Sequence, residues 1–190
     1  MHNIILEKVD NSEEIRIDIF SRLVQNRIIF IDDLISDKAT ADVLSLILFL
    51  DRENQNKITL FINAECGDIR NVFAIYDAMK LASSPLETFC IGSAMREAVL
   101  LVAAGTKGYR IVTQNADICV SQVVSPYVSH GDLTNTQISH QKTVRDNNAF
   151  LKELAKNTGK SFKELKKDTE RQLFLTPNQA VKYGIADRVV

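Results

Sequence analysis

Arg96 lies on a turn whose pattern suits a catalytic nucleophile. The segment 91–101 has the pattern of a strand end, a glycine turn and an apolar helix. A nucleophile on such a turn gains from the helix N-terminus, because the unpaired N–H groups there stabilise developing negative charge. Arginine keeps its positive charge at ordinary pH and has no lone pair with which to attack. The turn therefore suits nucleophilic catalysis, but the residue on it cannot perform that chemistry.

The composition is that of one globular domain. The chain has 190 residues, of which 45% are hydrophobic and 25% charged, and this length allows a sizeable core. The net charge of -1 gives no reason to expect binding to nucleic acid or to a membrane surface. Cys66, Cys90 and Cys119 form no CxxC pair, so we predict no disulfide framework, metal or cofactor. The odd cysteine count and the lack of a signal-peptide pattern at the start favour the cytoplasm.

Strand and helix patterns alternate along the first two thirds of the chain. Ser12 and Ser36 are placed to cap helices, and the second helix is expected to bury Ala41, Leu44, Ile47 and Leu48. The expected elements are, in order, helix 13–25, strand 27–31, helix 37–50, strand 58–63, loop 64–68, helix 69–82, strand 86–91, helix 98–105, and strands 109–113 and 118–122. Apolar strands joined by helices predict an α/β fold with a parallel sheet, in which sites gather at the carboxyl ends of the strands.

The last third follows another pattern. A long helix is predicted over 135–157, with Gly159 as its stop. Its sparse apolar positions are Ile138, Val144, Phe150, Leu151 and Leu154. Two interpretations are open: an arm that projects and pairs with another copy, or a solvated helix lying on its own domain. Capping boxes at Ser161 and Thr176 start two further helices, and 185–190 is expected to be a strand.

Segments spread over nearly the whole chain resemble ClpP, the proteolytic subunit of the ATP-dependent Clp protease. They include Phe61–Asn63, Ala74–Met79, Cys90–Gly92, Ala103–Gly108, Lys167–Arg171 and Ala180–Asp187. The resemblance implies a single ClpP-like domain over 1–190, with a crotonase-like core of repeated βαβ units and a protruding helical handle. It places an N-terminal axial segment and helix over 1–26, the head over 27–122 and 160–190, and the handle over 123–159. It also implies heptameric rings around a chamber, on which an AAA+ unfoldase docks.

The chemistry of that family does not carry over. The family uses a Ser-His-Asp triad, and the matching positions here are Arg96, Ser121 and Gln172. Ser121 cannot act as a base near neutral pH, and Gln172 has no charge with which to stabilise an imidazolium. The oxyanion-hole positions match Gly67 and Glu97. We therefore interpret the chain as an inactive subunit similar to the ClpR type, which joins rings of itself or of an active ClpP paralogue and modulates ATP-dependent proteolysis.

The alternative hypothesis is a serine peptidase with a displaced nucleophile such as Ser93. Ser93 is on the same turn, whereas His130 and His140 fall in the handle. A triad is defined by geometry, so a helix-start serine and exposed polar histidines are the more ordinary interpretation. Cys66 has no histidine placed to activate it and is expected to be a small buried thiol. The ClpP motifs disfavour a third hypothesis, a crotonase-type activity on acyl-CoA.

A charge partner is expected for Arg96. Glu65, Asp68 and Glu97 all lie in the two loops that would border the cleft. Burying an arginine without a partner would cost roughly several kcal/mol, so one of these carboxylates is predicted to pair with it.

Two contact surfaces follow from the resemblance. Arg171 matches an arginine that pairs with an acid across the ring–ring interface, but its neighbour here is Gln172. Pairing between identical rings is therefore expected to be weaker, which favours a mixed assembly. The positions that match the unfoldase-docking surface are Thr59, Phe61, Phe89, Ile91, Ile111 and Thr113. Thr59 and Thr113 replace larger apolar residues, so docking is expected to be weak or to involve a different unfoldase.

Overall fold

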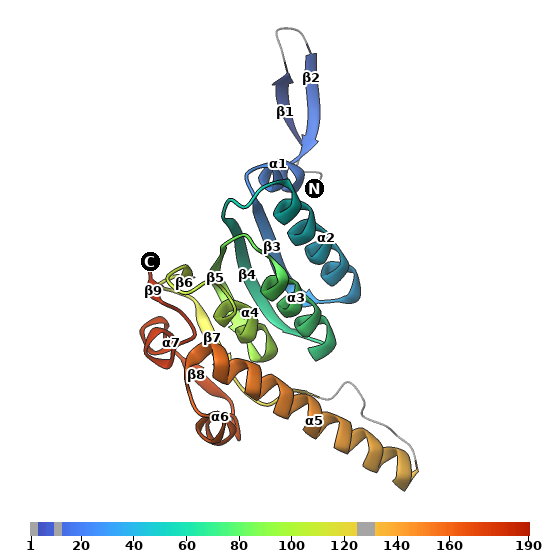
Figure 1. Ribbon diagram of the computed structural model, residues 1–190, viewed down its shortest axis with the longest axis vertical. Helices are drawn as coiled ribbons and strands as arrows, with labels where there is room; N and C mark the ends of the chain where they lie inside the picture. The colour runs from blue at the N-terminus through green and yellow to red at the C-terminus, as the bar shows by residue number, and fades with distance from the viewer. Residues whose placement is uncertain (1–3, 10–12, 125–131) are drawn as a thin grey trace.

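A mostly parallel sheet forms the centre of the molecule in the computed structural model, which describes residues 4–9, 13–124 and 132–190 (Figure 1). The seven strands are β3 (Ile28–Ile35), β4 (Ile58–Gly67), β5 (Leu86–Met95), β6 (Arg110–Val112), β7 (Asp117–Val120), β8 (Leu173–Leu175) and β9 (Arg188–Val189). The main path runs β3-β4-β5-β6-β9 with parallel pairing throughout. The expected α/β fold is confirmed, because the helices between these strands supply the crossovers that parallel pairing needs.

The sheet forks at β5. Its first half, Thr88–Cys90, pairs with β6, and its last residues, Ser93–Met95, pair with β7. β7 also pairs with β8, in the antiparallel sense, with Val120 opposite Leu173. The fork therefore brings the end of β5, the end of β7 and the start of β8 to one place.

Helices α2, α3 and α4 lie together on one side of β3, β4 and β5 (Figure 1). The helices are α1 (Ile19–Gln25), α2 (Asp37–Glu53), α3 (Ile69–Leu81), the 3-10 turn η2 (Arg96–Ala98), α4 (Val99–Ala103), α5 (Leu133–Thr158), α6 (Phe162–Asp168) and α7 (Pro177–Tyr183). Alternate residues of β4, namely Ile58, Leu60 and Ile62, are fully buried, and every residue of α4 is buried. The central strands and α4 thus form the core, as near-continuously apolar segments should.

The helix caps expected from the sequence are present. Ser36 accepts a hydrogen bond from the amide of Ala39 at the start of α2. Ser161 and Thr176 form capping boxes at the starts of α6 and α7. Gly159 ends α5 in the left-handed conformation, with φ of 79°. Such caps depend only on residues within one turn of the helix end, which makes them readable from the sequence.

The helix expected over 13–25 is wrong for its first half. Residues Glu13–Asp18 form β2, which pairs antiparallel with β1 (Ile4–Val9), and only Ile19–Gln25 is helical. Charged residues alternate with isoleucines from Glu14 to Asp18, which is the period of a strand. Asp18 caps α1 by accepting a hydrogen bond from the amide of Ser21, and the expected cap Ser12 lies outside the described residues.

The central strands run further than expected. Residues 64–67 of the loop predicted over 64–68 are instead the end of β4, and Asp68 caps α3. The strands β3 and β5 continue to Ile35 and Met95. A bulge between Asp33 and Leu34 keeps β3 in register with β4. The long strands pair with one another, so the polar residues at their ends stay in the sheet and still satisfy their backbone groups.

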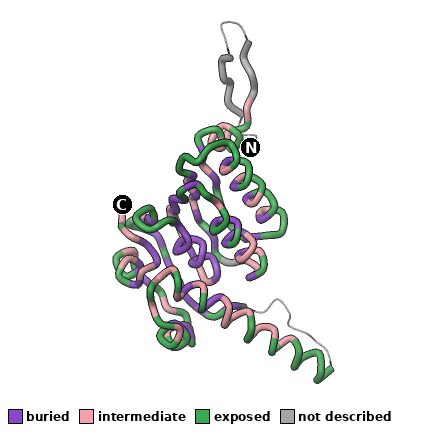
Figure 2. Tube along the Cα trace, in the orientation of Figure 1, coloured by how far each residue is buried: buried purple, intermediate pink, exposed green. Residues whose placement is uncertain are grey.

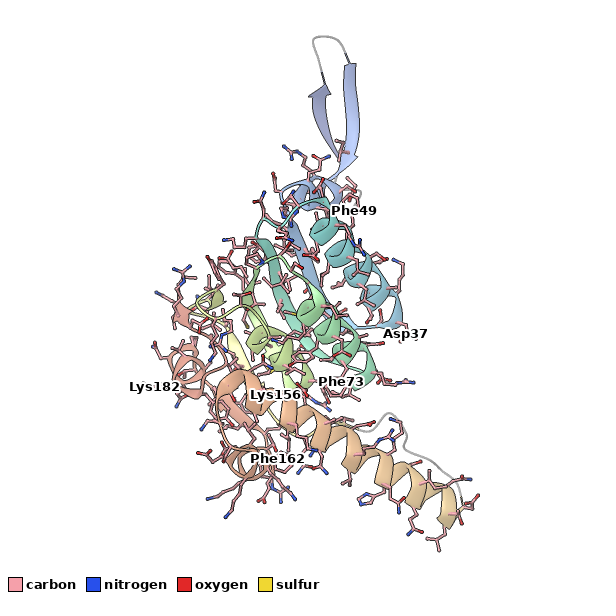
Figure 3. All side chains as sticks on the ribbon, viewed as in Figure 1. Asp37, Phe49, Phe73, Lys156, Phe162 and Lys182 are labelled. Atoms are coloured by element: carbon pink, nitrogen blue, oxygen red, sulfur yellow. The ribbon has the colours of Figure 1, made fainter. Side chains whose placement is uncertain are left out.

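The buried face of α2 also differs from the expected one. Thr40, Val43, Ile47 and Leu50 are buried, whereas Leu48 is 53% exposed and Ala41 is exposed. Phe49, labelled on α2 in Figure 3, is exposed as well. The hydroxyl of Thr40 donates to the carbonyl of Ser36 at 2.8 Å, so a polar residue can face the core. The helix has two apolar faces, and its packing partners decide which one is buried.

The long helix α5 projects from the rest of the molecule over its first half (Figures 1 and 2). Phe150, Leu151 and Leu154, near its C-terminal end, are fully buried, whereas Ile138 and Val144 are exposed. The helix is therefore an arm anchored at one end. No helix in the described part of the chain is long and apolar enough to cross a membrane.

Candidate functional site

A strained backbone bend joins β5 to α4. Arg96, the first residue after β5, has φ of 58°, which lies in the left-handed region that residues other than glycine rarely adopt. Gly92 also has a positive φ, and a Cβ there would lie 2.4 Å from Oδ1 of Asn63. A non-glycine residue with a left-handed backbone lowers the stability of the fold by on the order of 1–3 kcal/mol, and this conformation persists only where the surrounding structure enforces it. We therefore expect the residues packed around β5 and α4 to hold this bend in place.

Arg96 and Glu97 form a close but incomplete ion pair. Nε of Arg96 lies 3.7 Å from Oε2 of Glu97, and neither of these buried atoms has a hydrogen-bond partner among the described residues. The Arg96 side chain remains 24% exposed, whereas that of Glu97 is 2% exposed. Oε1 of Glu97 accepts a hydrogen bond from the amide of Val124 at 2.9 Å. Burial raises the pKa of Glu97, and the Val124 amide and the Arg96 charge oppose that shift only in part.

The other two acids expected near Arg96 are placed differently. Asp68 caps α3 and accepts hydrogen bonds from Nε of Arg70 at 3.0 Å, and these bonds lower its pKa. Glu65 is exposed near the end of β4. Of the three carboxylates, the structure places Glu97 within ion-pair distance of Arg96.

Strand register brings Arg96, Ser121 and Gln172 together. Met95 pairs with Cys119, and Val120 pairs with Leu173. Arg96 follows Met95, Ser121 follows Val120 and Gln172 precedes Leu173, so these three residues meet where the sheet forks. There they line a pocket of about 430 Å³, hereafter the Arg96 pocket. Its lining residues are Arg96, Ser121, Gln122, Val124, Thr169, Glu170, Arg171 and Gln172.

Gly67, one of the two predicted oxyanion positions, ends β4 opposite Ile35. A Cβ at Gly67 would lie 2.6 Å from the Cβ of Ile35, so strand packing alone requires a glycine there. The role of Gly67 and Glu97 as oxyanion positions stays a prediction.

The model of the Clp protease family matches residues 11–190 of this chain. The chain belongs to the Clp protease family. The matched residues include the whole forked sheet and every residue that lines the Arg96 pocket.

Within the described residues, the lining of the Arg96 pocket in this Clp protease family member lacks the histidine of a Ser-His-Asp triad. Among the described residues that line it, Glu170 is the only carboxylate and none is a histidine. Ser121 is 8% exposed, and its hydroxyl donates to the carbonyl of Gln122 at 3.3 Å. Arg171 and Gln172 are exposed on the connection between α6 and β8. Arginine and glutamine side chains bind and position groups but neither attack nor accept a proton at neutral pH, and a serine such as Ser121 needs a neighbouring base before it can attack.

Ser93 hydrogen-bonds to an amide rather than to a base. Its hydroxyl donates to Oδ1 of Asn63 at 3.3 Å, and its backbone amide donates to the same atom at 3.0 Å. Nδ2 of Asn63 in turn donates to Oδ1 of Asp32 at 2.7 Å. An amide oxygen does not take a proton from serine at neutral pH, so this chain of bonds links β3, β4 and β5 without activating Ser93.

Histidine and cysteine offer no substitute within the described structure. His140 is the only histidine in that part of the chain, and it is exposed on α5. His130 and the side chain of Cys66 lie outside what is described. Cys90 and Cys119 are buried free thiols, and burial raises the pKa of Cys90 to about 12. Thiols of this kind are not nucleophiles at neutral pH.

The six predicted docking positions alternate along one face of the sheet, on β4, on β5, and on or just after β6. Phe61 pairs with Phe89, and Phe89 with Ile111. Ile91 is 44% exposed and Ile111 is fully buried. The positions Thr59, Phe61, Phe89 and Thr113 are half-buried. This face of the sheet is thus partly exposed at Phe61, Phe89 and Ile91.

An aromatic row extends this surface, and the sequence reasoning missed half of it. The row consists of Phe20, Phe30, Phe61 and Phe89, with ring centroids 6.0, 5.3 and 5.0 Å apart in that order. Phe30 is 40% exposed and Phe20 is 56% exposed. The signal for Phe30 was present, because it alternates with the buried Ile29 and Ile31 of an apolar strand.

Proposed function

We propose that this chain is a catalytically inactive Clp protease subunit, which assembles into heptameric rings with an active ClpP paralogue and modulates ATP-dependent proteolysis in the cytoplasm. The observation that carries the proposal is the left-handed bend at Arg96. Such a bend presents a nucleophile at a strand-to-helix junction in other hydrolases, at a cost in strain. Here the bend is kept while its side chain is a guanidinium, so the scaffold of a hydrolytic site is present without its nucleophile.

Ser121 and Gln172 support the same conclusion, because they share the Arg96 pocket. A triad needs a base next to the nucleophile and an acid that orients the base. Neither residue supplies these functions, and an active site with all three groups replaced has no path for proton transfer.

The mixed ring is proposed from the charges around Arg171. Arg171 is exposed, and within the described residues it has no ion-pair partner. Its neighbour Gln172 brings no carboxylate, so a second copy of this chain offers no acid at the matching place. A paralogue that keeps an acid there would supply one, which favours mixed over homotypic contacts.

An AAA+ unfoldase is proposed to dock on the face of the sheet that carries Phe61, Phe89 and Ile91. Exposed aromatic residues in a continuous patch are typical of protein contacts. On the same face, the hydroxyl of Thr59 donates to Oε2 of Glu87 at 3.1 Å, so the surface beside Phe61 is polar there. Weak docking, or docking of a different unfoldase, follows from this.

A fluorophosphonate probe tests the loss of activity. The purified chain is expected to remain unlabelled and to leave a fluorogenic peptide intact, whereas an active ClpP paralogue assayed alongside labels and cleaves. Labelling that disappears in Ser93→Ala would contradict the proposal and establish the displaced-nucleophile peptidase.

Co-expression tests the assembly. With an active ClpP paralogue from the same genome, native mass spectrometry is expected to show rings that contain both chains. A homotypic ring that excludes the paralogue, or a genome without a second ClpP gene, would contradict the mixed ring without bearing on the loss of activity.

A further inference from the structure

We propose that the cationic pocket at the C-terminal ends of α3, α4 and α5, hereafter the Lys80 pocket, binds a phosphate group. The pocket has a volume of about 270 Å³, and its charged lining residues are Lys80, Lys107, Arg110 and Lys156. It shares no lining residue with the Arg96 pocket and includes none of the six docking positions on the sheet. A phosphate bound there would therefore be a property separate from the proposed function.

Four basic side chains meet in the Lys80 pocket, and among the described residues its lining contains no carboxylate. Lys80 and Lys156 lie in the last turns of α3 and α5, and Figure 3 labels Lys156 there. Lys107 lies in the turn after α4, and Arg110 begins β6. Because α4 contacts both α3 and α5 (Figure 1), these segments converge although they are far apart in the sequence.

The helix ends account for part of this positive charge. The last carbonyls of a helix carry a partial negative charge, which a nearby cation stabilises. Nζ of Lys80 donates to the carbonyl of Ala104, just past α4, at 2.9 Å, and Nη1 of Arg110 donates to the carbonyl of Asn157 in α5 at 2.9 Å. The guanidinium of Arg110 also binds Asp187, with Nε at 3.0 Å from Oδ2. Lys80 and Arg110 thus have structural partners already.

Lys107 and Lys156 bring donors that the helix ends do not use. Within the described residues Lys107 has no hydrogen bond or ion pair, and it is exposed at the pocket. Nζ of Lys156 donates to Oε1 of Glu153 at 2.7 Å, so two of its three N–H groups stay available. The hydroxyl of Thr106 accepts from the amide of Leu86 at 3.0 Å and keeps its own hydrogen to donate. The pocket therefore has spare donors on a lysine-rich rim.

The positive charge around Lys80 is compensated only in part. Burial lowers the pKa of Lys80, and the charge of Arg110 lowers it further, whereas Glu153 opposes the shift. Arg110 has this effect although it is paired with Asp187. An anion in the pocket would stabilise the Lys80 ammonium group and relieve its repulsion by Arg110.

The kind of donor favours phosphate over carboxylate. Arginine forks bind a carboxylate through two parallel bonds, whereas lysine binds phosphate as a point charge. Among the described lining residues Arg110 carries the one guanidinium, and Asp187 already binds it. The spare donors come from separate segments, which suits the tetrahedral oxygens of phosphate. The volume lies just below the usual range for ligand pockets, so it fits free phosphate or a small phosphate ester.

Isothermal titration calorimetry on the full chain tests the site in a phosphate-free buffer at fixed ionic strength. The probes are sodium phosphate, glycerol phosphate and sodium acetate. Both phosphates are expected to saturate one site per chain and to bind at least about tenfold more tightly than acetate. Tighter binding of glycerol phosphate would identify a phosphate ester as the ligand, and equal or weaker binding would identify free phosphate.

Four variants locate the site. Lys107→Gln is expected to weaken phosphate binding about tenfold, because it removes an ammonium group that has no structural partner. Lys156→Gln is expected to weaken it severalfold, and Glu153→Gln to strengthen it severalfold by freeing Lys156. Lys182→Gln is the matched control, because Lys182 is exposed on α7, outside the pocket lining, and labelled in Figure 3. It is expected to leave the affinity unchanged.

Several results would overturn the site. They are the absence of saturable phosphate binding, acetate that binds as tightly as phosphate, and native affinity in Lys107→Gln. An equal loss in Lys182→Gln would also overturn it, because general attraction of anions to a basic surface would then explain the heat. None of these results bears on the proposed loss of activity or on ring assembly.

Discussion

The left-handed backbone at Arg96 makes glycine preferable to alanine at this position. Arg96→Gly and Arg96→Ala remove the same guanidinium, so they differ only in backbone preference. The φ of 58° costs a residue with a Cβ about 1–2 kcal/mol. Glycine loses about 0.4–1 kcal/mol more than alanine through its freer unfolded chain. The glycine variant is therefore expected to be more stable by about 0.5–1 kcal/mol, which is about 1–4 °C in Tm for a chain of this size.

Urea unfolding followed by circular dichroism measures this difference. The control pair is Arg145→Gly and Arg145→Ala, in the exposed middle of α5. There the sign reverses, and alanine is expected to be more stable by about 1 kcal/mol because glycine is unfavourable inside a helix. An Arg96→Ala variant as stable as Arg96→Gly, with the control pair behaving as expected, would refute an enforced left-handed bend.

Three further predictions concern buried groups and helix ends. Burial raises the pKa of Glu97 above its ordinary value of 4.5, so the native chain loses stability as the pH rises from about 4.5. In urea titrations, Glu97→Gln should therefore be more stable than the native chain at neutral pH and equally stable below pH 4.5. Asp187→Asn should cost about 3–5 kcal/mol in urea unfolding, because it leaves the buried Arg110 without its ion-pair partner. Gly159→Ala should lower the free energy of unfolding by about 1 kcal/mol, because residue 159 has φ of 79° and a Cβ there would meet no atom. Gly184→Ala should cost clearly more, because a Cβ at residue 184 would collide with the carbonyl oxygen of Thr158 at the end of α5.

An exposed ion pair serves as the control for the buried pair between Asp187 and Arg110. Asp42→Asn breaks the exposed pair with Lys38 and should change stability by less than about 0.5 kcal/mol. A cost at Asp42 equal to that at Asp187 would mean that burial does not decide the value of an ion pair here. A Glu97→Gln variant that is less stable than native at neutral pH would mean that the pair with Arg96 outweighs burial.

Local patterns were readable from the sequence, and contacts between distant segments were not. The caps at Ser36, Ser161 and Thr176 and the stop at Gly159 each depend on a few neighbouring residues. The buried face of α2 depends on what packs against it, and its two apolar faces look alike in the sequence. The strand β8 has only three residues, too few for a periodic pattern.

The candidate site shows the same division. The α/β pattern and the position of Arg96 on a strand-to-helix turn could be predicted, because strand and helix signals flank it closely. The sequence could not predict that Glu97, rather than Glu65 or Asp68, would be the carboxylate next to Arg96. That outcome depends on Asp68 binding Arg70 and on the amide of Val124, 27 residues away from Glu97. An arginine gives no local sign of a positive φ, so the strain at the bend also required the structure.

The hydrogen bond between the Val124 amide and Glu97 has a consequence for assembly. This bond lowers the proton affinity of a buried carboxylate at the point where the chain leaves the sheet towards α5. Linkage is reciprocal, so a partner that pulls Val124 away raises the pKa of Glu97 further and draws a proton from solution. The heat of a ring formation that moves this segment would then contain the ionisation enthalpy of the buffer that supplies the proton, so titrations in different buffers report on the contact.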